Sequence, residues 1–430
     1  MKLKRIISLA SMPLLAASLA GCFGKSTTKE GELLIWTFSD EMSKICQKYY
    51  SGNVKVIEKT SVTQVTADLA NVQRSGKGIP DVVCLEAAVV AKLTDKTLDN
   101  SSLLSLDDIS GTEQMYDYTK SVAKTVDGHL LGLSWQATPG GFFYKEDIAA
   151  QVGINSVEAM EVKISTWQGY LELAEECKAK NIAICSSIVD PVKVFLGARN
   201  KGWVDSTNTL QMEDVMFGPT SAPTYNCFDV VRSLHQDGYT HQTSDRDKGW
   251  FKDIPSSDTL GYFCSSWGLS FDLMPNAGTT AGHWKMCKAP VNYFKGGTWL
   301  SIPKGATNVD LAKSFIKYLT TDQTFLKARG EETGDFMNSR SVMQELSQNY
   351  SCSFLGGQNH LKKLYEVAEH VNGNLISPYD ATIDSVFTSV VGDFAQHATG
   401  SASDIEEERE LQKDAFITGV RSKYNNIIVK

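Results

Sequence analysis

The stretch ELLIWTFSDEMSKICQKYYSGNVKVIEKTSVTQVTADLANVQRSGKGIPDVVCLE, residues 32–86, decides the fold class. Three short apolar runs, at 32–38, 53–60 and 81–86, are typical of strands because they are rich in β-branched and aromatic residues. Between them, apolar residues recur at helical spacing, at Met42, Ile45, Cys46 and Tyr49 and again at Val62, Val65, Leu69 and Val72. This alternation predicts an α/β fold with a parallel sheet and helices on its faces.

Polar residues follow the first and third strands of this segment. Ser39, Asp40 and Glu41 come after the first strand, and Glu86 ends the third. In open parallel sheets, ligands bind beyond the carboxyl ends of the strands. We therefore expect these side chains to lie at the edge where a ligand would bind.

Upstream of this segment, residues 1–21 have the features of a secretory leader. Lys2, Lys4 and Arg5 precede the apolar run 6–20, which is shorter than the roughly 18 to 20 residues of a membrane-spanning helix. The sequence LAGC at 19–22 resembles the bacterial lipobox, so cleavage before Cys22 and acylation of Cys22 are predicted. Residues 22–31 would form a lipid-anchored tether, holding the protein at the cell membrane on its extracytoplasmic side. The alternative is an ordinary secretory leader with an incidental cysteine.

The composition excludes some partners. Removing residues 1–21 would lower the formal charge from −8 to −11, so a nucleic-acid partner is not expected. Eight cysteines follow Cys22, and none forms a C-x-x-C pair, which argues against a zinc ribbon or a thioredoxin-like site. Several lie in predicted strands, which favours buried free thiols over disulfides, although pairing of Cys177 with Cys185 stays open.

A second α/β pattern begins near residue 150. A helix is predicted over TWQGYLELAEECKAK at 166–180, capped by Ser165 or Thr166, with Gln168 completing a capping box from Ser165. The strand IAICSSI at 182–188 would follow it. A charge-rich helix is expected over about 404–423.

The sequence contains no strong catalytic motif. There is no G-x-S-x-G, H-E-x-x-H, G-x-x-x-x-G-K-[ST] or G-x-G-x-x-G pattern. A pair of carboxylates for glycoside hydrolysis stays open, because 50 acidic residues place some pair near any cleft. We therefore expect no catalytic residues, no metal site, no cofactor and no enzyme activity.

Several segments together resemble the extracellular solute-binding proteins, family 1, of bacterial carbohydrate ABC importers, the group that includes maltose-binding protein. They are GKGIPDVV at 76–83, DGHLLGLSW at 127–135, FFYKEDIAAQVGI at 142–154, TWQGYLELAEECK at 166–178, FDVVRSLHQDGYT at 228–240, LGYFCSSWG at 260–268 and the stretch 296–342, which begins GGTWLSIPKG. The resemblance covers about 31–345 in the same order. Residues 197–227 match poorly, and Ser134 stands where proline is common.

The resemblance implies a two-lobed periplasmic-binding-protein fold of type II. Each lobe would be a mixed, mostly parallel sheet flanked by helices, with the lobes discontinuous in sequence and joined by a hinge. Lobe one is expected to hold 32–140 and 296–335, and lobe two 141–295 and 336–430. Such proteins close around a ligand held between the lobes.

The candidate ligand-binding residues include aromatic platforms, carboxylates, an amide and glycines. Aromatic faces bury the apolar side of a sugar, and charged groups hydrogen-bond its hydroxyls. The resemblance assigns sugar stacking to Trp267 and exposed backbone beside the ligand to Gly296 and Gly297. The other candidates are Asp40, Glu86, Trp135, Gln136, Trp203, Trp299 and Asp335. The alternative for Trp267 and Trp203 is a place in the core, and for Asp40 and Glu86 a solvated loop acid.

These features predict a monomeric, lipid-anchored receptor that captures a mono- or oligosaccharide and delivers it to the permease subunits of an ABC importer. One alternative is a receptor for another solute, such as a polyol, a glycerophosphodiester or a peptide-like molecule. Phosphate-bearing ligands usually need arginines or helix N-termini, and the predicted cleft segments are poor in arginine. The alternative from another functional class is a surface glycosidase or an adhesin.

Overall fold

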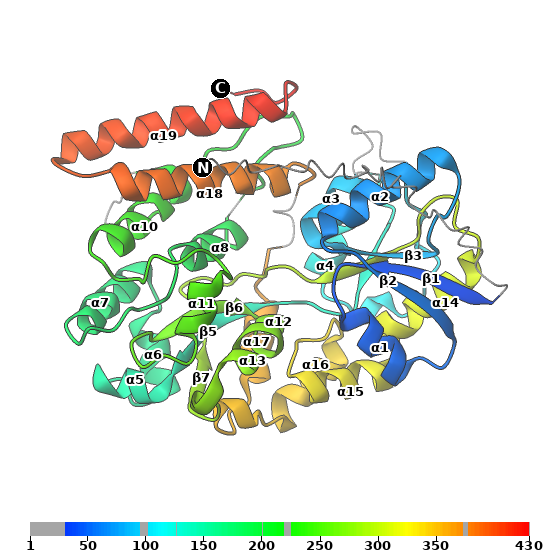
Figure 1. Ribbon diagram of the computed structural model, residues 1–430, viewed down its shortest axis with the longest axis horizontal. Helices are drawn as coiled ribbons and strands as arrows, with labels where there is room; N and C mark the ends of the chain where they lie inside the picture. The colour runs from blue at the N-terminus through cyan, green and yellow to red at the C-terminus, as the bar shows by residue number, and fades with distance from the viewer. Residues whose placement is uncertain are drawn as a thin grey trace, which may run out of the picture.

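The computed structural model describes residues 31–94, 102–125, 127–199, 201–218, 225–372 and 377–429. The predicted signal peptide, Cys22 and the tether up to residue 30 lie outside the described residues. Figure 1 shows two sheets side by side, each with helices around it.

The first sheet has five strands in the order β2-β1-β3-β8-β4. The strands β1 (Glu32–Thr37), β2 (Asn53–Glu58) and β3 (Val82–Glu86) are parallel, as the sequence predicts. The strand β8 (Thr298–Ser301) runs antiparallel to β3 and to β4 (Leu133–Ser134). Residues 33–37 are all buried, as expected for a strand covered on both faces.

Helices α1 to α4, α14 and α15 accompany this sheet, whereas α16 packs on α15 and on α17, and α17 contacts strands of the second sheet. Ser61 caps α2 by accepting a hydrogen bond from the Gln64 N–H, and Gly76 ends α2 in the left-handed conformation, with φ of 64°. The bounds are α1 Glu41–Tyr49, α2 Val62–Ser75, α3 Ala87–Thr94, α4 Asp117–Val122, α14 Val309–Thr321, α15 Gln323–Thr333, α16 Arg340–Asn349 and α17 His360–Ala368.

The second sheet differs from the prediction, because its three strands are antiparallel rather than mostly parallel. Their order is β6-β5-β7, with β5 (Gly140–Lys145) between β6 (Gly261–Ser265) and β7 (Trp284–Cys287). The predicted strand at 182–188 forms only isolated parallel bridges, at Ala183 and Cys185. These strands lie far apart in the sequence, so local patterning could not give their direction.

Helices α5 to α13, with α18 and α19, accompany the second sheet. Thr166 caps α7 by accepting from the Gly169 N–H, while the Ser165 hydroxyl donates to the Val162 carbonyl, so the capping box predicted from Ser165 is wrong. The bounds are α5 Glu146–Gln151, α6 Val157–Lys163, α7 Trp167–Lys178, α8 Val189–Gly197, α9 Asp214–Phe217, α10 Cys227–Gln236, α11 Lys248–Asp253, α12 Ser266–Gly268, α13 Met274–Asn276, α18 Asp380–His397 and α19 Ala402–Lys423.

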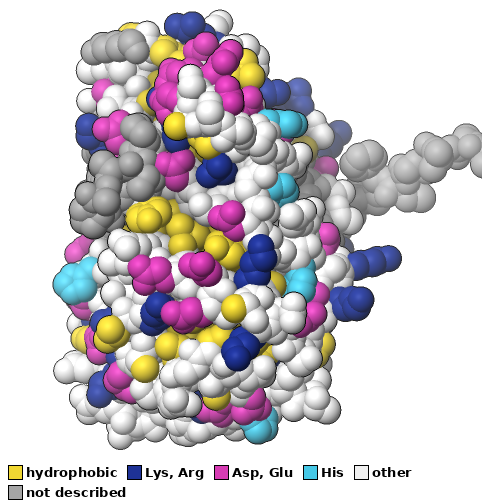
Figure 2. Space-filling model, turned by 90° about the vertical axis from the view of Figure 1, so that its left-hand side faces the viewer, with side chains coloured by type: hydrophobic (Ala, Val, Ile, Leu, Met, Phe, Trp, Pro, Cys, Tyr) yellow, Lys and Arg dark blue, Asp and Glu magenta, His cyan; other side chains and the backbone are white. Residues whose placement is uncertain are grey.

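The charge-rich helix predicted over about 404–423 is α19, which packs along α18 (Figure 1). Acidic side chains gather near the upper end of the face drawn in Figure 2, where α19 begins. No helix of the described residues is both long and apolar enough to cross a membrane.

Two hydrophobic clusters share the second sheet between them. Along β5, Phe142 and Tyr144 point into one cluster and Phe143 into the other, which is the two-residue period of a strand. The cluster that holds Phe143 continues through the first sheet, and the other extends through α7, α10 and α18. The eight cysteines after Cys22 are all described, buried and free, so the preference for free thiols is confirmed and Cys177 is not paired with Cys185.

Candidate functional site

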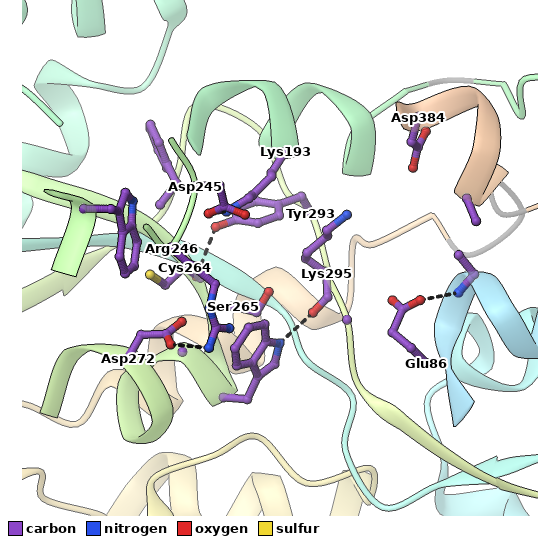
Figure 3. A pocket seen from close by; sticks show the side chains of 17 residues that line it. Glu86, Lys193, Asp245, Arg246, Cys264, Ser265, Asp272, Tyr293, Lys295 and Asp384 are labelled. Carbon is purple, nitrogen blue, oxygen red and sulfur yellow. Dashed lines mark hydrogen bonds and ion pairs between the residues drawn. The ribbon is translucent and has the colours of Figure 1, made fainter. Parts of the chain in front are cut away.

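Three adjoining cavities lie between the two sheets, and together they are called the cleft here. The main cavity has a volume of about 410 Å³, and its lining comes from β3 and α3, from β6 and α12, and from α8, α18 and two loops (Figure 3). The second cavity, of about 320 Å³, is lined by Phe38, Ser39 and Glu41 beside the end of β1. A side pocket of about 50 Å³ lies between α3, α8 and α18. Glu86 and Gly296 line all three.

The carboxyl ends of β1 and β3 form the first-sheet side of the cleft. Glu86 is the last residue of β3, and its carboxylate accepts a hydrogen bond of 3.0 Å from the Ala88 N–H. Burial raises the pKa of Glu86, and the positive charge of Lys295 opposes this rise. The edge predicted from the sequence is therefore a lined cavity, with Ser39, Glu41 and Glu86 on it.

Glu41 is a buried acidic residue at this edge. Its carboxylate lies 2.8 Å from the Arg329 guanidinium, and both side chains are at least nine-tenths buried. Burial raises the pKa of Glu41 to about 7, although the Arg329 charge lowers it.

Trp267 is the aromatic platform of the cleft. It lies in α12 directly after β6, is partly exposed, and lines both larger cavities. Its indole N–H donates to the Lys295 carbonyl at 2.9 Å, which fixes the plane of the ring (Figure 3). The Arg246 guanidinium lies 5.3 Å from the ring centre, and the Phe271 ring meets its edge.

Gly296 and Gly297 bring backbone close to Trp267. Their φ angles are +70° and +99°, which strongly favour glycine. A Cβ on residue 296 would lie 2.9 Å from the Trp267 indole nitrogen, and one on residue 297 would lie 3.1 Å from the Trp299 ring. The glycine pair is therefore required by the packing around the platform.

Three chain segments meet where the chain passes between the sheets. Residues 135–139 join β4 to β5, residues 288–297 join β7 to β8, and residues 334–338 follow α15. Bridges pair Gln136 with Met337 and Pro139 with Phe294. The chain therefore crosses between the sheets through hydrogen-bonded neighbours, which suits a hinge.

Asp335 anchors these crossings from behind the cleft. The Gln136 side-chain amide donates to it at 2.7 Å, and the Ser266 hydroxyl and the Phe336 N–H also donate to it. Asp335 is buried and lines none of the three cavities, whereas Gln136 lines the second. Asp335 therefore holds Gln136 in place rather than facing the cleft itself.

A buried histidine in the same region gives a pH-dependent stability. His360 is fully buried, its Nε2 lies 2.8 Å from the Gly334 carbonyl, and its Nδ1 has no hydrogen-bond partner. Burial lowers the pKa of His360 from 6.5 to about 4. Below pH 6.5 the unfolded chain therefore binds a proton that the folded chain does not, and stability falls as the pH falls towards 4.

Replacing His360 with glutamine is expected to remove this pH dependence of the unfolding free energy. Between pH 7 and pH 5, wild type should lose about 2 kcal/mol more of its unfolding free energy than His360→Gln does. Urea denaturation at pH 7 and pH 5 measures the unfolding free energy of each protein. The contributions of all other titratable groups are the same in wild type and variant, so they cancel when the two losses are compared. The exposed His370→Gln should behave as wild type, and equal losses in all three proteins would contradict the prediction.

Four other predicted site residues lie outside the cleft lining. Asp40 is exposed and pairs with Lys44 at 2.7 Å on α1. Trp135, Trp203 and Trp299 are each 1% exposed. The Trp203 indole donates to Asp384 at 2.6 Å and the Trp299 indole to the Thr119 carbonyl at 3.0 Å, so both rings are held in the core. The structure does not bring these four to the cavities, whereas it does bring together Glu86, Gln136, Trp267, Gly296 and Gly297.

Sequence reasoning missed most of the charged residues of the main cavity. They are Lys193, Asp245, Arg246, Asp272, Lys295 and Asp384. Lys295 directly precedes the predicted glycine pair and could have been found there. The others come from α8, α18, the segment after α12 and the loop before α11, and no local pattern marks them.

The comparisons with known proteins agree with this geometry. A family model described as bacterial extracellular solute-binding protein matches residues 41–348. The chain belongs to this family. The resemblance noted in the sequence is thereby confirmed, and with it the predicted α/β fold class, apart from the strand direction of the second sheet.

Individual relatives share the fold at low identity. An arabinooligosaccharide-binding protein of Bacillus subtilis (strain 168) is 22% identical over 407 residues, covering 86% of this chain and 90% of its own. The ABC-transporter-associated binding protein of B. animalis subsp. lactis Bl-04, solved with beta-1,6-galactobiose, has a TM-score of 0.68 at 20% identity, covering 93% of this chain and 99% of that one. The galacto-N-biose-/lacto-N-biose I-binding protein of Bifidobacterium longum, solved with lacto-N-biose, has a TM-score of 0.66 at 14% identity, covering 91% and 97%.

Proposed function

We propose that the chain is the receptor of an ABC importer, which captures a mono- or oligosaccharide in the cleft and delivers it to the permease subunits without chemical change. The observation that carries this proposal is Trp267, an aromatic face left partly exposed in a cavity whose other walls present carboxylates and lysines. Such a mixture matches the apolar face and hydroxyl rim of a sugar. The saccharides named for the three relatives described above also support it.

The proposed mechanism is closure of two lobes around the ligand. Lobe one would comprise residues 32–140 and 296–335, and lobe two residues 141–295 and 336–430. The crossings at 135–139, 288–297 and 334–338 would bend, bringing Glu86 on one side and Trp267 on the other onto the same ligand. Small-angle X-ray scattering should show a smaller radius of gyration with ligand, and an unchanged radius would contradict closure.

The proposed anchor is an acylated Cys22 at the end of a short tether, with the monomer facing the extracytoplasmic side. Each buried acyl methylene contributes about 0.8 kcal/mol of membrane affinity. Cys22→Ser is expected to move the protein from the membrane fraction to the soluble fraction of its host. An equal distribution of both proteins would overturn the anchor.

A saccharide screen tests the binding function. Because all described elements lie within 31–429, the chain is produced from residue 23 onwards. Mono- and oligosaccharides are added and the melting temperature is measured; a ligand at a hundredfold excess over its Kd stabilises by about 2.7 kcal/mol. A saccharide-specific rise, with the sugar recovered intact, supports the receptor. Cleaved sugar would indicate a glycosidase, and a rise only with polyols or glycerophosphodiesters another solute.

Substituting Gly296 tests the platform geometry. In Gly296→Ala, the added methyl group would meet the Trp267 indole and the φ of +70° would be strained. We expect roughly tenfold weaker binding of the saccharide found in the screen, measured by titration calorimetry, because Trp267 must shift. Gly153→Ala is the matched control: its φ is +81°, yet its Cβ would meet nothing within 4 Å, so binding should be unchanged. Equal affinities for both variants would contradict the argument.

A further inference from the structure

Lys295 brings an unpaired positive charge into the cleft. Its side chain lines the main cavity and the side pocket (Figure 3). Within the described part of the chain, its ammonium forms no ion pair and no hydrogen bond; only its backbone bonds to Trp267 and Thr138. Three charged donors are therefore available to a ligand.

Arg246 adds a second set of donors. Its guanidinium is held by the buried Asp272 at 2.8 Å and lies over Trp267, and it lines both larger cavities. Among the described residues, no other hydrogen bond or ion pair engages it. Its side chain is 41% exposed, so its remaining N–H groups are accessible beside the platform.

The side pocket contains a third cation with spare capacity. Arg199 is only 4% exposed, and its guanidinium donates to the Leu196 carbonyl and to Asp380. Its Nη1 has no hydrogen-bond partner in the described structure. A buried, unpaired guanidinium nitrogen indicates a missing acceptor.

The acidic residues of the cleft are mostly engaged already. Lys193 pairs with Asp245, Arg246 with Asp272, and the Trp203 indole and Arg199 lie against Asp384. Glu86 has one carboxylate oxygen bonded to the Ala88 N–H, and burial raises the pKa of its carboxyl group. After these internal pairs are formed, the charged donors still available to a ligand are the Lys295 ammonium and the remaining N–H groups of Arg246 and Arg199.

We infer that the saccharide bound in the cleft carries an anionic group, a carboxylate or a phosphate, which Lys295 and Arg246 bind beside the Trp267 platform. This rests on the proposed function. Charge-assisted hydrogen bonds are roughly twice as strong as neutral ones, and the arginine fork fits either anion. The expectation that the cleft is poor in arginine is wrong, because tertiary folding brings Arg246 and Arg199 into it from loops and helix ends.

Paired ligands test the inference. Melting shifts are compared for galactose and galacturonate, for glucose and glucuronate, and for glucose 6-phosphate, together with the neutral and acidic disaccharides galactobiose and digalacturonate. The Kd of the best ligand is then measured in wild type, Lys295→Met, Arg246→Gln and Lys304→Met. Lys304 is an exposed lysine of the same stretch that lines none of the three cavities, so its variant is the matched control.

An acidic sugar should bind more tightly than its neutral partner. Its affinity should fall roughly 10- to 100-fold in Lys295→Met, fall in Arg246→Gln, and stay unchanged in Lys304→Met. Unchanged melting temperatures without ligand show that the variants fold. A uronate preference identifies the carboxylate and a sugar-phosphate preference the phosphate, and either supports the inference. Equal or tighter binding of neutral sugars would overturn the anionic ligand but not the proposed saccharide receptor. No melting shift with any saccharide would overturn both the anionic ligand and the saccharide receptor.

Discussion

Trp267→Ala is expected to weaken binding of the transported saccharide by roughly 30- to 1000-fold, the largest effect of any single substitution in the cleft. The ring is partly exposed and lines both larger cavities, so it is the aromatic surface on which a sugar would stack. Its loss also removes the surface on which Arg246 lies, 5.3 Å from the ring centre. Two sets of ligand contacts would therefore be lost together.

Trp267→Phe separates the ring from its hydrogen bond. Phenylalanine keeps an aromatic face but cannot donate to the Lys295 carbonyl, so a smaller loss, of a few fold, is expected. Titration calorimetry gives the Kd, and circular dichroism checks the fold. Binding of a saccharide by Trp267→Ala with wild-type affinity would show that the platform is elsewhere.

Asp81→Ala is expected to have the largest effect on stability, about 3 to 5 kcal/mol. Asp81 is fully buried at the entry to β3, and its carboxylate accepts hydrogen bonds from the backbone N–H groups of Leu34, Thr307 and Asn308 at 2.9 to 3.2 Å. Each buried donor left without a partner costs about 1 to 3 kcal/mol. Alanine would leave the buried Leu34 N–H and the partly buried N–H groups of Thr307 and Asn308 without this acceptor, at the junction of β1, β3 and the approach to α14.

Urea denaturation followed by tryptophan fluorescence measures this loss. Asp81→Asn keeps one carbonyl oxygen as an acceptor and should lose roughly half as much. Asp310→Ala, an exposed acid in the first turn of α14, is the control and should cost under about 1 kcal/mol. An Asp81→Ala protein as stable as Asp310→Ala would contradict the role given to this carboxylate.

The local pattern predicted those parts of the site that depend on strand ends. The sequence predicts Glu86 at the ligand edge, because β3 ends there and parallel neighbours share one edge. Trp267, Gly296 and Gly297 came from the family resemblance, and all three line the cleft. Their ligand contacts stay predictions.

The tryptophans show where sequence reasoning fails. Trp203 and Trp299 have apolar neighbours much as Trp267 does, yet the indole N–H groups of the first two bond to Asp384 and Thr119 inside the core. Whether a tryptophan face is covered depends on residues more than 150 positions away, such as Asp384 for Trp203 and Thr119 for Trp299. No local pattern carries that information.

The sequence by itself determined the helices and parallel strands of 32–86, because the period of apolar residues is a local property that each element needs in order to bury one face. It also determined family membership, since the matched segments recur in order. Only the tertiary structure decided the antiparallel order of the second sheet and the set of charges around the main cavity. Both depend on contacts between segments far apart in the chain, where burial and pairing, rather than local propensity, control the free energy.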